Sequence, residues 1–379
     1  MVFLIIHNEY QHRGGEESVV DFQKNLLEQH GHKVILYSRN YHELGDSSWG
    51  RIKSIFTSVY NSKSIKDIKR IVRQEKPNVA IIHNVFSIIS PAIIPALKKM
   101  NVKVWQIVHN YRMFCPIGIF FHNGKICEQC LKAGREFHCA KNNCTNSRIQ
   151  SLAFAFKFFM VRKLNYYKGV DRFLCLNRKQ IKQLNQYGIE KSRLHLLPNA
   201  ISGYPLQETR RIEEKKYIGF AGRLTKEKGV EDLIKLAKLL PNYVFRIAGS
   251  TATGFDIKRV PANIEFLGFL NKREIIEFYS TNRVLLFLSH WYETFGLTAI
   301  ESMACSTPVI TYSVNAASEI IDNELDGFIV EDFDLNKVVR RIERLFSDNE
   351  GYSIMCQNAL GKVKQRYTEE QYYENLINI

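Results

Sequence analysis

Two glutamates eight positions apart mark a strand-to-helix junction in the C-terminal half of the chain. The stretch reads Glu293-Thr-Phe-Gly-Leu-Thr-Ala-Ile-Glu301 and follows the apolar run Val284–Ser289. The run predicts a strand and residues 297–304 predict a helix, so Glu293 lies on the loop and Glu301 about one turn into the helix. A helix start favours an anion, and carboxylates accept hydrogen bonds from hydroxyls. Together they fit a sugar nucleotide; the alternative is a solvated acidic pair.

A basic loop earlier in the same half adds phosphate-binding groups. The stretch Tyr217–Gly229 predicts a short strand ending at Gly222-Arg223, then a loop with Lys226 and Lys228, then a helix from Val230. Open α/β sheets bind ligands at the C-terminal ends of their strands. Arginine offers a planar fork to phosphate and lysine a point charge. We therefore expect the arginine and lysines of this loop to balance a diphosphate without a metal ion; an ordinary basic loop is the alternative.

The two stretches, in this order, resemble the E-x7-E signature and the basic loop of retaining glycosyltransferases of the GT-B fold, in particular glycosyltransferase family 4. The resemblance implies an α/β protein with two doubly wound, Rossmann-like domains facing a central cleft. It also implies that Arg223 and Lys228 contact the donor diphosphate, Glu301 the ribose and Glu293 the sugar. The donor-binding set that it implies is Gly14, Gly15, Asn199, Gly222, Arg223, Lys228, Gly249, Glu293, Phe295, Gly296, Leu297 and Glu301.

His109 closes the predicted strand 102–108. The sequence His109-Asn-Tyr-Arg-Met-Phe-Cys-Pro116 resembles a motif of a subgroup of the family. There the histidine lies near the transferred sugar and phosphate, so we expect His109 to hydrogen-bond one of them and not to relay protons. The resemblance implies front-face chemistry, in which the departing phosphate oxygen helps to accept the acceptor proton and the protein stabilises the diphosphate charge. The catalytic set is then His109, Arg223, Lys228 and Glu293.

Both halves alternate predicted strands and helices, which is typical of two parallel sheets. We predict a Rossmann-like acceptor-side domain at 1–200, a nucleotide-sugar domain at 201–364 and a last helix at 365–379 that crosses back. Hydrophobic residues make up 45% of the chain, enough for two cores. No run of about 18 uncharged apolar residues occurs, so no transmembrane helix is expected. The start of the chain resembles a buried strand and not a signal peptide.

The cysteines are unevenly distributed. Five of the eight lie in the loop 115–144, at Cys115, Cys127, Cys130, Cys139 and Cys144. The C-x2-C pair with further thiols nearby suits a tetrahedral zinc site. Two alternatives stay open: a structural zinc ion held by four of the five, or reduced free thiols. A zinc ion at this place would have no part in catalysis.

The net charge of +15 and pI of about 9.3 indicate an anionic partner. An enzyme at an anionic membrane surface fits, and so does a nucleic-acid binder. A zinc-containing nucleic-acid module, however, leaves the two sugar-nucleotide loops unexplained. The aromatic and basic segment 147–168 favours a core helix with one wet edge over an interfacial helix. The basic run Arg51–Arg73 is either a membrane-surface patch or a solvated helix face.

The sequence therefore predicts a hexosyltransferase-type enzyme that uses a UDP- or GDP-sugar without a catalytic metal. The expected acceptor is a lipid-linked or oligosaccharide hydroxyl in bacterial surface polysaccharide synthesis. The expected location is the cytoplasm, peripheral at the inner face of the cell membrane, with no nucleic-acid partner. A catalytically silent sugar-nucleotide-binding protein and a GT-B epimerase are the alternatives. The base, sugar, acceptor, linkage and oligomeric state are not identified by these residues.

Overall fold

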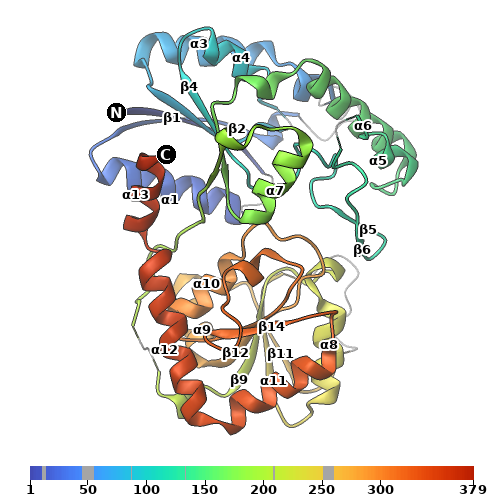
Figure 1. Cartoon of the computed structure of the whole chain (residues 1–379), viewed down its shortest axis with the longest axis vertical. Helices are drawn as coiled ribbons and strands as arrows, with labels where there is room; N and C mark the ends of the chain where they lie inside the picture. Colours follow the sequence, from blue (N-terminus) through green and yellow to red (C-terminus); the bar gives the residue numbers. More distant parts are fainter. Residues whose placement is uncertain (11–13, 45–54, 87, 133, 208–209, 251–259) are drawn as a thin grey trace. The chain divides into compact units, whose positions relative to one another are not determined.

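The chain forms two compact α/β units, seen in a computed structural model that describes residues 1–10, 14–44, 55–86, 88–132, 134–207, 210–250 and 260–379 (Figure 1). Unit 1 comprises Met1–Phe120, Cys127–Pro198 and Asn375–Ile379, and unit 2 comprises Phe121–Ile126 and Asn199–Glu374. Each unit contains a six-stranded sheet whose strands all run parallel. The predicted fold class, two doubly wound α/β sheets, is confirmed. The roles given to segments 1–200, 201–364 and 365–379 stay predictions.

The sheet of unit 1 has the order β2-β1-β3-β4-β7-β8. Its strands are β1 (Val2–Glu9), β2 (Lys33–Asn40), β3 (Val79–Asn84), β4 (Lys103–Ile107), β7 (Arg172–Cys175) and β8 (Leu194–Leu196). The central strands are continuous apolar runs because helices cover both faces of a parallel sheet. Phe3–Ile6 of β1 and Ala80–Ile82 of β3 are fully buried, which makes this pair of strands the centre of the core.

Helices and short 3-10 turns connect these strands. They are α1 (Gly15–Gln29), η1 (Tyr41–Leu44), α3 (Ser62–Glu75), α4 (Ile93–Lys98), α5 (His138–Lys141), α6 (Arg148–Lys163), η2 (Tyr166–Gly169), α7 (Arg178–Tyr187) and η3 (Lys191–Arg193). Side chains at the helix starts accept hydrogen bonds from free backbone N–H groups, as Asn61 does for α3, Ser147 for α6 and Asn177 for α7. A hairpin of β5 (Phe121–His122) and β6 (Lys125–Ile126) interrupts the run between β4 and α5.

The sheet of unit 2 has the order β11-β10-β9-β12-β13-β14. Its strands are β9 (Tyr217–Ala221), β10 (Phe245–Ala248), β11 (Ile264–Gly268), β12 (Asn282–Phe287), β13 (Val309–Tyr312) and β14 (Gly327–Val330). The helices and turns are η4 (Ile212–Glu214), η5 (Lys226–Lys228), α8 (Val230–Leu239), α9 (Lys272–Thr281), α10 (Leu297–Ala304), η7 (Ala316–Glu319), α11 (Leu335–Ser347), α12 (Asn349–Arg366) and α13 (Glu369–Asn378). The strand order reverses between β9 and β12, and such a switch point is where sheets of this kind bind ligands.

A hydrophobic core cluster packs the sheet of unit 2 against α8 and α11. Ile218 and Phe220 of β9, Leu233 of α8, Val284 of β12 and Ile342 of α11 are all buried in it. The 3- and 4-residue spacing of the apolar positions in α8 and α11 explains why each helix turns one face to the sheet. This core fixes the ends of β9 and β12, and with them the loops that carry both predicted stretches.

Candidate functional site

The two predicted stretches lie on neighbouring loops at the switch point of unit 2. β9 and β12 are paired in the sheet, so the loops that follow them start side by side. The backbone N–H of His290 donates a 2.9 Å hydrogen bond to the carbonyl of Glu227, which ties the β12–α10 loop to the turn η5. The basic loop and the glutamate loop therefore form one surface at the C-terminal edge of the sheet.

Glycines leave the backbone bare at this edge. Gly249 has φ 139°, and a Cβ atom there would lie 2.0 Å from the carbonyl oxygen of Gly222, so only glycine lets β9 and β10 end this close together. Gly296 has φ 112° and begins α10 without a capping side chain. The N–H groups of the first turn of α10 are thus available to an anion.

Glu293 is held by three donors. Its Oε1 atom accepts hydrogen bonds from Lys228 Nζ at 2.5 Å, Ser289 Oγ at 2.7 Å and Trp291 Nε1 at 2.8 Å. The Lys228 ammonium also lies 5.5 Å from the centre of the Trp291 ring. The structure brings two predicted residues, Lys228 and Glu293, into direct contact. Ser289 and Trp291 were missed, although both stand within four positions of Glu293.

Glu301 lies in α10 and is paired with tyrosines. Tyr279 donates its hydroxyl to Glu301 Oε2 at 2.8 Å. Tyr204 also hydrogen-bonds Glu301, and burial together with this carboxylate raises the pKa of Tyr204. A carboxylate has about four acceptor positions, so Glu301 keeps capacity for a ribose diol. Neither tyrosine could be found from the sequence, because both are far from the motif along the chain.

The remaining predicted residues of unit 2 differ in their surroundings. Arg223 is exposed, and its side chain makes no hydrogen bond or ion pair within the described ranges. Asn199 is buried, and its Oδ1 atom has no hydrogen-bond partner among the described residues. Phe295 is buried with its ring 6.0 Å from that of Tyr367, so its side chain is occupied by packing. Leu297 is the first residue of α10.

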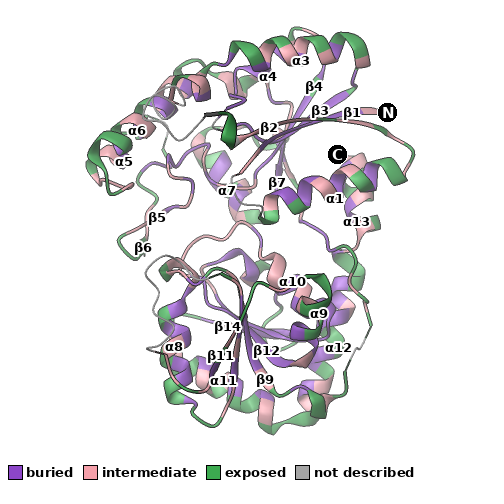
Figure 2. Cartoon of the chain, turned by 180° about the vertical axis from the view of Figure 1, so that it is seen from behind, coloured by how far each residue is buried: buried purple, intermediate pink, exposed green. Residues whose placement is uncertain are grey.

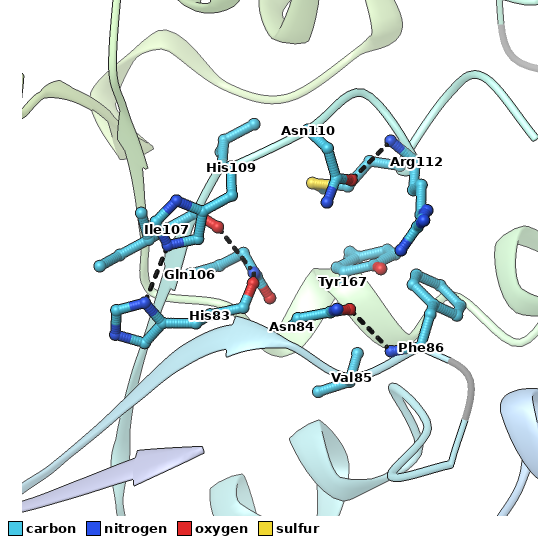
Figure 3. Close-up of a pocket in the computed structure, with 12 residues that line it drawn as sticks. His83, Asn84, Val85, Phe86, Gln106, Ile107, His109, Asn110, Arg112 and Tyr167 are labelled. Carbon is cyan, nitrogen blue, oxygen red and sulfur yellow. Dashed lines mark hydrogen bonds between the residues drawn. The ribbon is translucent and has the colours of Figure 1, made fainter. Parts of the chain in front are cut away.

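His109 belongs to unit 1, where it follows β4 and stacks on His83 with ring centres 5.0 Å apart (Figure 3). The nitrogen atoms His109 Nε2 and His83 Nδ1 are 2.8 Å apart, and His83 Nε2 is 2.9 Å from the Gln23 side-chain oxygen. Because an amide oxygen only accepts, His83 Nε2 carries the proton and His83 Nδ1 accepts from His109 Nε2–H. Burial, followed by the effect of His7, lowers the pKa of His109 to about 3.

The hydrogen-bond chain gives His109 a definite chemical character. A neutral imidazole with its proton on Nε2 has a lone pair on Nδ1, and that atom can only accept. It suits a sugar hydroxyl and does not suit a phosphate oxygen, which needs a donor. The hollow beside His109 that Figure 3 shows has a volume of about 20 Å³, room for roughly one water molecule.

The glycine loop of unit 1 opens α1 as the sequence predicts. Glu17 accepts hydrogen bonds from the backbone N–H groups of Gly14 at 2.8 Å and Tyr10 at 3.0 Å, and α1 begins at Gly15. Gly14 and Gly15 are both exposed, so their backbone is accessible. The positions Gln11–Arg13 of this loop lie outside the described residues.

Next to this loop lies a polar hollow with unsatisfied buried groups. Both ring nitrogens of His7 and the Oε1 atom of Glu16 are buried without a hydrogen-bond partner in the described structure. Burial raises the pKa of Glu16 to about 8, and burial lowers that of His7. A cavity of about 430 Å³ adjoins His7 and is lined mainly by polar side chains, among them Glu9, Tyr10, Glu17, Ser38 and Asn40.

The predicted cysteine loop contains free thiols. All five of its cysteines are unpaired by disulfides, and Cys130 and Cys139 are buried in a small cluster with Ala155. Burial, followed by the nearby thiols of Cys115, Cys144 and Cys127, raises the pKa of Cys130 to about 12. Among the described residues, no group of three or more His, Cys, Asp or Glu side chains is arranged to hold a metal ion. The zinc alternative therefore gains no support from this geometry.

Sequence comparison decides the family. The profile described as Glycosyltransferase Family 4 matches residues 13–202, half of the chain, and that described as Glycosyl transferases group 1 matches residues 206–362. The chain is a member of glycosyltransferase family 4. The family resemblance inferred from residues 217–301 is thus confirmed, and the second profile covers both loops of the unit 2 site.

Relatives of this family 4 chain include a protein of a cps region and a capsular polysaccharide biosynthesis glycosyltransferase. An uncharacterized 41.2 kDa protein in the cps region of Klebsiella pneumoniae is 32% identical over 183 residues, which are 45% of this chain and 51% of the relative. The capsular polysaccharide biosynthesis glycosyltransferase CapM of Staphylococcus aureus is 28% identical over 186 residues, 45% of this chain and 49% of CapM. The chain spans about half the length of these curated relatives.

Solved structures agree on the fold. The crystal structure of Anabaena Alr3699/HepE in complex with UDP-glucose superposes with a TM-score of 0.67 at 15% identity, and all of both chains is covered. At this identity the likeness shows the fold alone. The predicted GT-B fold of two parallel-sheet α/β domains is therefore confirmed for this family 4 member.

Proposed function

We propose that this protein transfers a sugar from a nucleotide diphosphate-sugar to an acceptor hydroxyl, with retention at the anomeric carbon. The observation that carries the proposal is the contact between Lys228 and Glu293 on joined loops at the switch point of unit 2. It puts a diphosphate-binding cation beside a sugar-binding carboxylate at the N-terminal end of α10. A UDP-sugar is the first donor to test, because the similar Anabaena protein was crystallised with UDP-glucose; a GDP-sugar is the second.

Each donor contact has a separate role in this proposal. Arg223 and Lys228 bind the diphosphate, and the exposed Arg223, whose side chain has no partner among the described residues, offers its fork for this purpose. Glu301 binds the ribose diol and Glu293 the sugar hydroxyls. Asn199 offers the donor a buried acceptor atom that otherwise stays unsatisfied, which costs about 1–3 kcal/mol in the empty protein.

The chemistry needs no protein nucleophile. The bond from the anomeric carbon to the diphosphate oxygen breaks, and the acceptor oxygen attacks the same face of the sugar. The acceptor proton passes to the departing phosphate oxygen. Lys228, Arg223 and the first turn of α10 stabilise the charge that grows on the diphosphate, so the account assigns no step to a metal ion. His109 accepts a hydrogen bond from a hydroxyl of the transferred sugar and keeps it in position.

We further propose that the acceptor is a lipid-linked or oligosaccharide hydroxyl in surface polysaccharide synthesis. Two observations support this class. CapM, a relative, is named for capsular polysaccharide biosynthesis, and the hollow beside His7 contains ring nitrogens that have no hydrogen-bond partner among the described residues and suit sugar hydroxyls. Within the described residues, no helix is long and apolar enough to cross a bilayer. The net charge of +15 supports a peripheral position at the anionic inner face of the cell membrane.

Thermal unfolding with a panel of nucleotides tests donor binding. Ligands that bind the folded state raise the melting temperature by mass action. We expect UDP and one UDP-sugar to stabilise the protein more than ADP, and Glu301→Gln to lessen the effect of UDP. The same donor should release nucleoside diphosphate on incubation. If the donor raises the melting temperature but no nucleoside diphosphate is released with any acceptor, a catalytically silent binding protein is favoured. If the donor sugar is converted to another sugar without release of nucleoside diphosphate, an epimerase is favoured.

A further inference from the structure

The first half of helix α6 in unit 1 turns small residues inward and large apolar residues outward, whereas Phe158 and Val161 of its second half are buried. Ser151 and Ala155 are fully buried, whereas the side chains of Ile149, Leu152 and Phe156 are 85%, 52% and 46% exposed. Water-exposed large apolar residues occur singly on most proteins, but a contiguous set marks an interaction surface. Helix α6 thus has a buried face and one exposed edge, as the interpretation of 147–168 as a core helix with one wet edge expects, and this edge is apolar.

These residues form a continuous stripe. At about 100° per residue, positions 149, 152, 156 and 159 fall on one face of an α-helix. Phe159 extends the line, and its ring packs 5.7 Å from that of Phe137, which is itself 41% exposed. Helix α5 packs beside α6 at this place, as Figure 2 also shows. We call Phe137, Ile149, Leu152, Phe156 and Phe159 the α6 stripe.

Positive charge predominates around the α6 stripe along the chain, because Glu136, which precedes Phe137, is buried and paired with Arg162. Residues 137–170 contain six lysines and arginines and no aspartate or glutamate. Four of the six are exposed: Lys141, Arg148, Lys163 and Lys168. The Arg162 and Lys163 cations lie 5.5 and 5.9 Å from the centre of the Phe159 ring. Cations on long stems beside aromatic rings are typical of segments at the boundary between lipid headgroups and acyl chains.

We propose that the α6 stripe inserts into an anionic lipid surface, with the flanking cations bound to lipid headgroups. This inference rests on the proposed function, which places the protein at the inner face of the membrane, and it assigns the membrane contact to one helix. A second copy of the chain fits less well, because two such stripes would bring their cations together.

The basic run Arg51–Arg73 is a weaker candidate for the same role. Positions 51–54 lie outside the described residues. On α3, Lys63 and Arg70 are paired with the acidic residues Glu43 and Asp67. These two cations of α3 therefore have carboxylates beside them. In the segment 137–170 Arg162 is paired with the buried Glu136, but the four exposed cations have no ion pair among the described residues.

Sedimentation with lipid vesicles tests the proposal. The full-length wild-type protein should bind vesicles of phosphatidylethanolamine with phosphatidylglycerol, and bind pure phosphatidylcholine vesicles weakly. The double variant Ile149→Glu with Leu152→Glu should lower the partition coefficient by about tenfold or more, because charged residues replace buried apolar area. The matched control is Ile354→Glu on α12, an exposed isoleucine (55%) in unit 2. It should sediment like the wild type.

Three results would overturn the inference: a wild-type protein that ignores anionic vesicles, a double variant that binds like the wild type, or equal losses in both variants. The inference would also be overturned if the wild type were a dimer, the double variant a monomer and vesicle binding the same in both. The stripe would then be assigned to self-association. Nucleoside diphosphate release in solution keeps the two proposals apart. The double variant should retain this release. If no protein, the wild type included, released nucleoside diphosphate, the transferase proposal would be refuted and the lipid-binding result would be unaffected.

Discussion

Replacing Lys228 with methionine should separate catalysis from folding. The Lys228 side chain is 22% exposed and donates to Glu293 Oε1 at 2.5 Å. Methionine keeps most of the length and removes the charge. Glu293 still has Ser289 and Trp291 as donors, so its carboxylate is not left without a partner. We therefore expect the free energy of unfolding to fall by only about 1 kcal/mol, the contribution of one hydrogen bond in a partly exposed pair.

The effect on turnover should be much larger. A positioned cation stabilises the charge that grows on the diphosphate as the sugar leaves, and losing one such group costs about 3 kcal/mol of transition-state stabilisation. This corresponds to roughly a hundredfold fall in kcat. The assay is release of nucleoside diphosphate at saturating donor, with kcat and KM determined separately. A fall in kcat indicates a transition-state contact, whereas a rise in KM alone indicates ground-state binding.

Lys226 provides the matched control on the same turn. Its side chain is 81% exposed and is paired with Glu231 at 3.1 Å. Lys226→Met removes the same charge from η5 and should leave kcat within about twofold of the wild type, as expected for an exposed pair. If Lys228→Met and Lys226→Met have the same kcat, and the Lys228 variant is folded, the diphosphate clamp is assigned to the wrong residue.

Four further predictions address other parts of the account. Glu301→Gln should weaken UDP binding about tenfold in calorimetry, because a charge-assisted hydrogen bond to the ribose is lost; an unchanged affinity argues against the ribose contact. Ring ¹⁵N spectra should show His109 as the Nε2–H tautomer near neutral pH and a changed signal in His83→Phe, and a wild-type Nδ1–H tautomer would contradict the hydrogen-bond chain. Burial raises the pKa of Glu16 to about 8 in the folded state, so the folded protein keeps a proton that the unfolded chain releases above the ordinary glutamate pKa of about 4.5. The folded state therefore loses stability as pH rises from about 4.5 to 8, by at most about 1.4 kcal/mol per pH unit. Chemical denaturation should show Glu16→Gln gaining stability relative to the wild type over that range, and a difference that stays constant with pH would refute the shift. EDTA should leave the initial transfer rate intact, and a rapid loss restored by Mg²⁺ or Mn²⁺ would require a catalytic metal.

The sequence located the site loops well because each depends on local signals. The apolar runs before Gly222 and Glu293 predicted β9 and β12, and the helix at 297–304 was placed correctly. Their adjacency follows from the strand order of a doubly wound sheet. The roles of the individual side chains stay predictions, since no ligand contact has been observed.

Other features required the three-dimensional structure. The pairs Tyr279–Glu301 and His83–His109 join residues more than twenty positions apart, and no local pattern connects them. The exposed face of α6 could not be predicted from the sequence, for a different reason. Apolar residues cover most of its circumference, so periodicity could not tell the buried face from the exposed one; packing chose the face with Ser151 and Ala155.

Product analysis by NMR tests the central claim most directly. The purified protein is incubated with the nucleotide sugar that stabilises it most and with a lipid-linked glycan fraction as acceptor. We predict release of the nucleoside diphosphate and a new glycosidic bond with the anomeric configuration of the donor. Both should be lost in Lys228→Met. An inverted product would refute the retaining mechanism, and tight donor binding with no product from lipid-linked or soluble acceptors would contradict the proposed transferase activity itself.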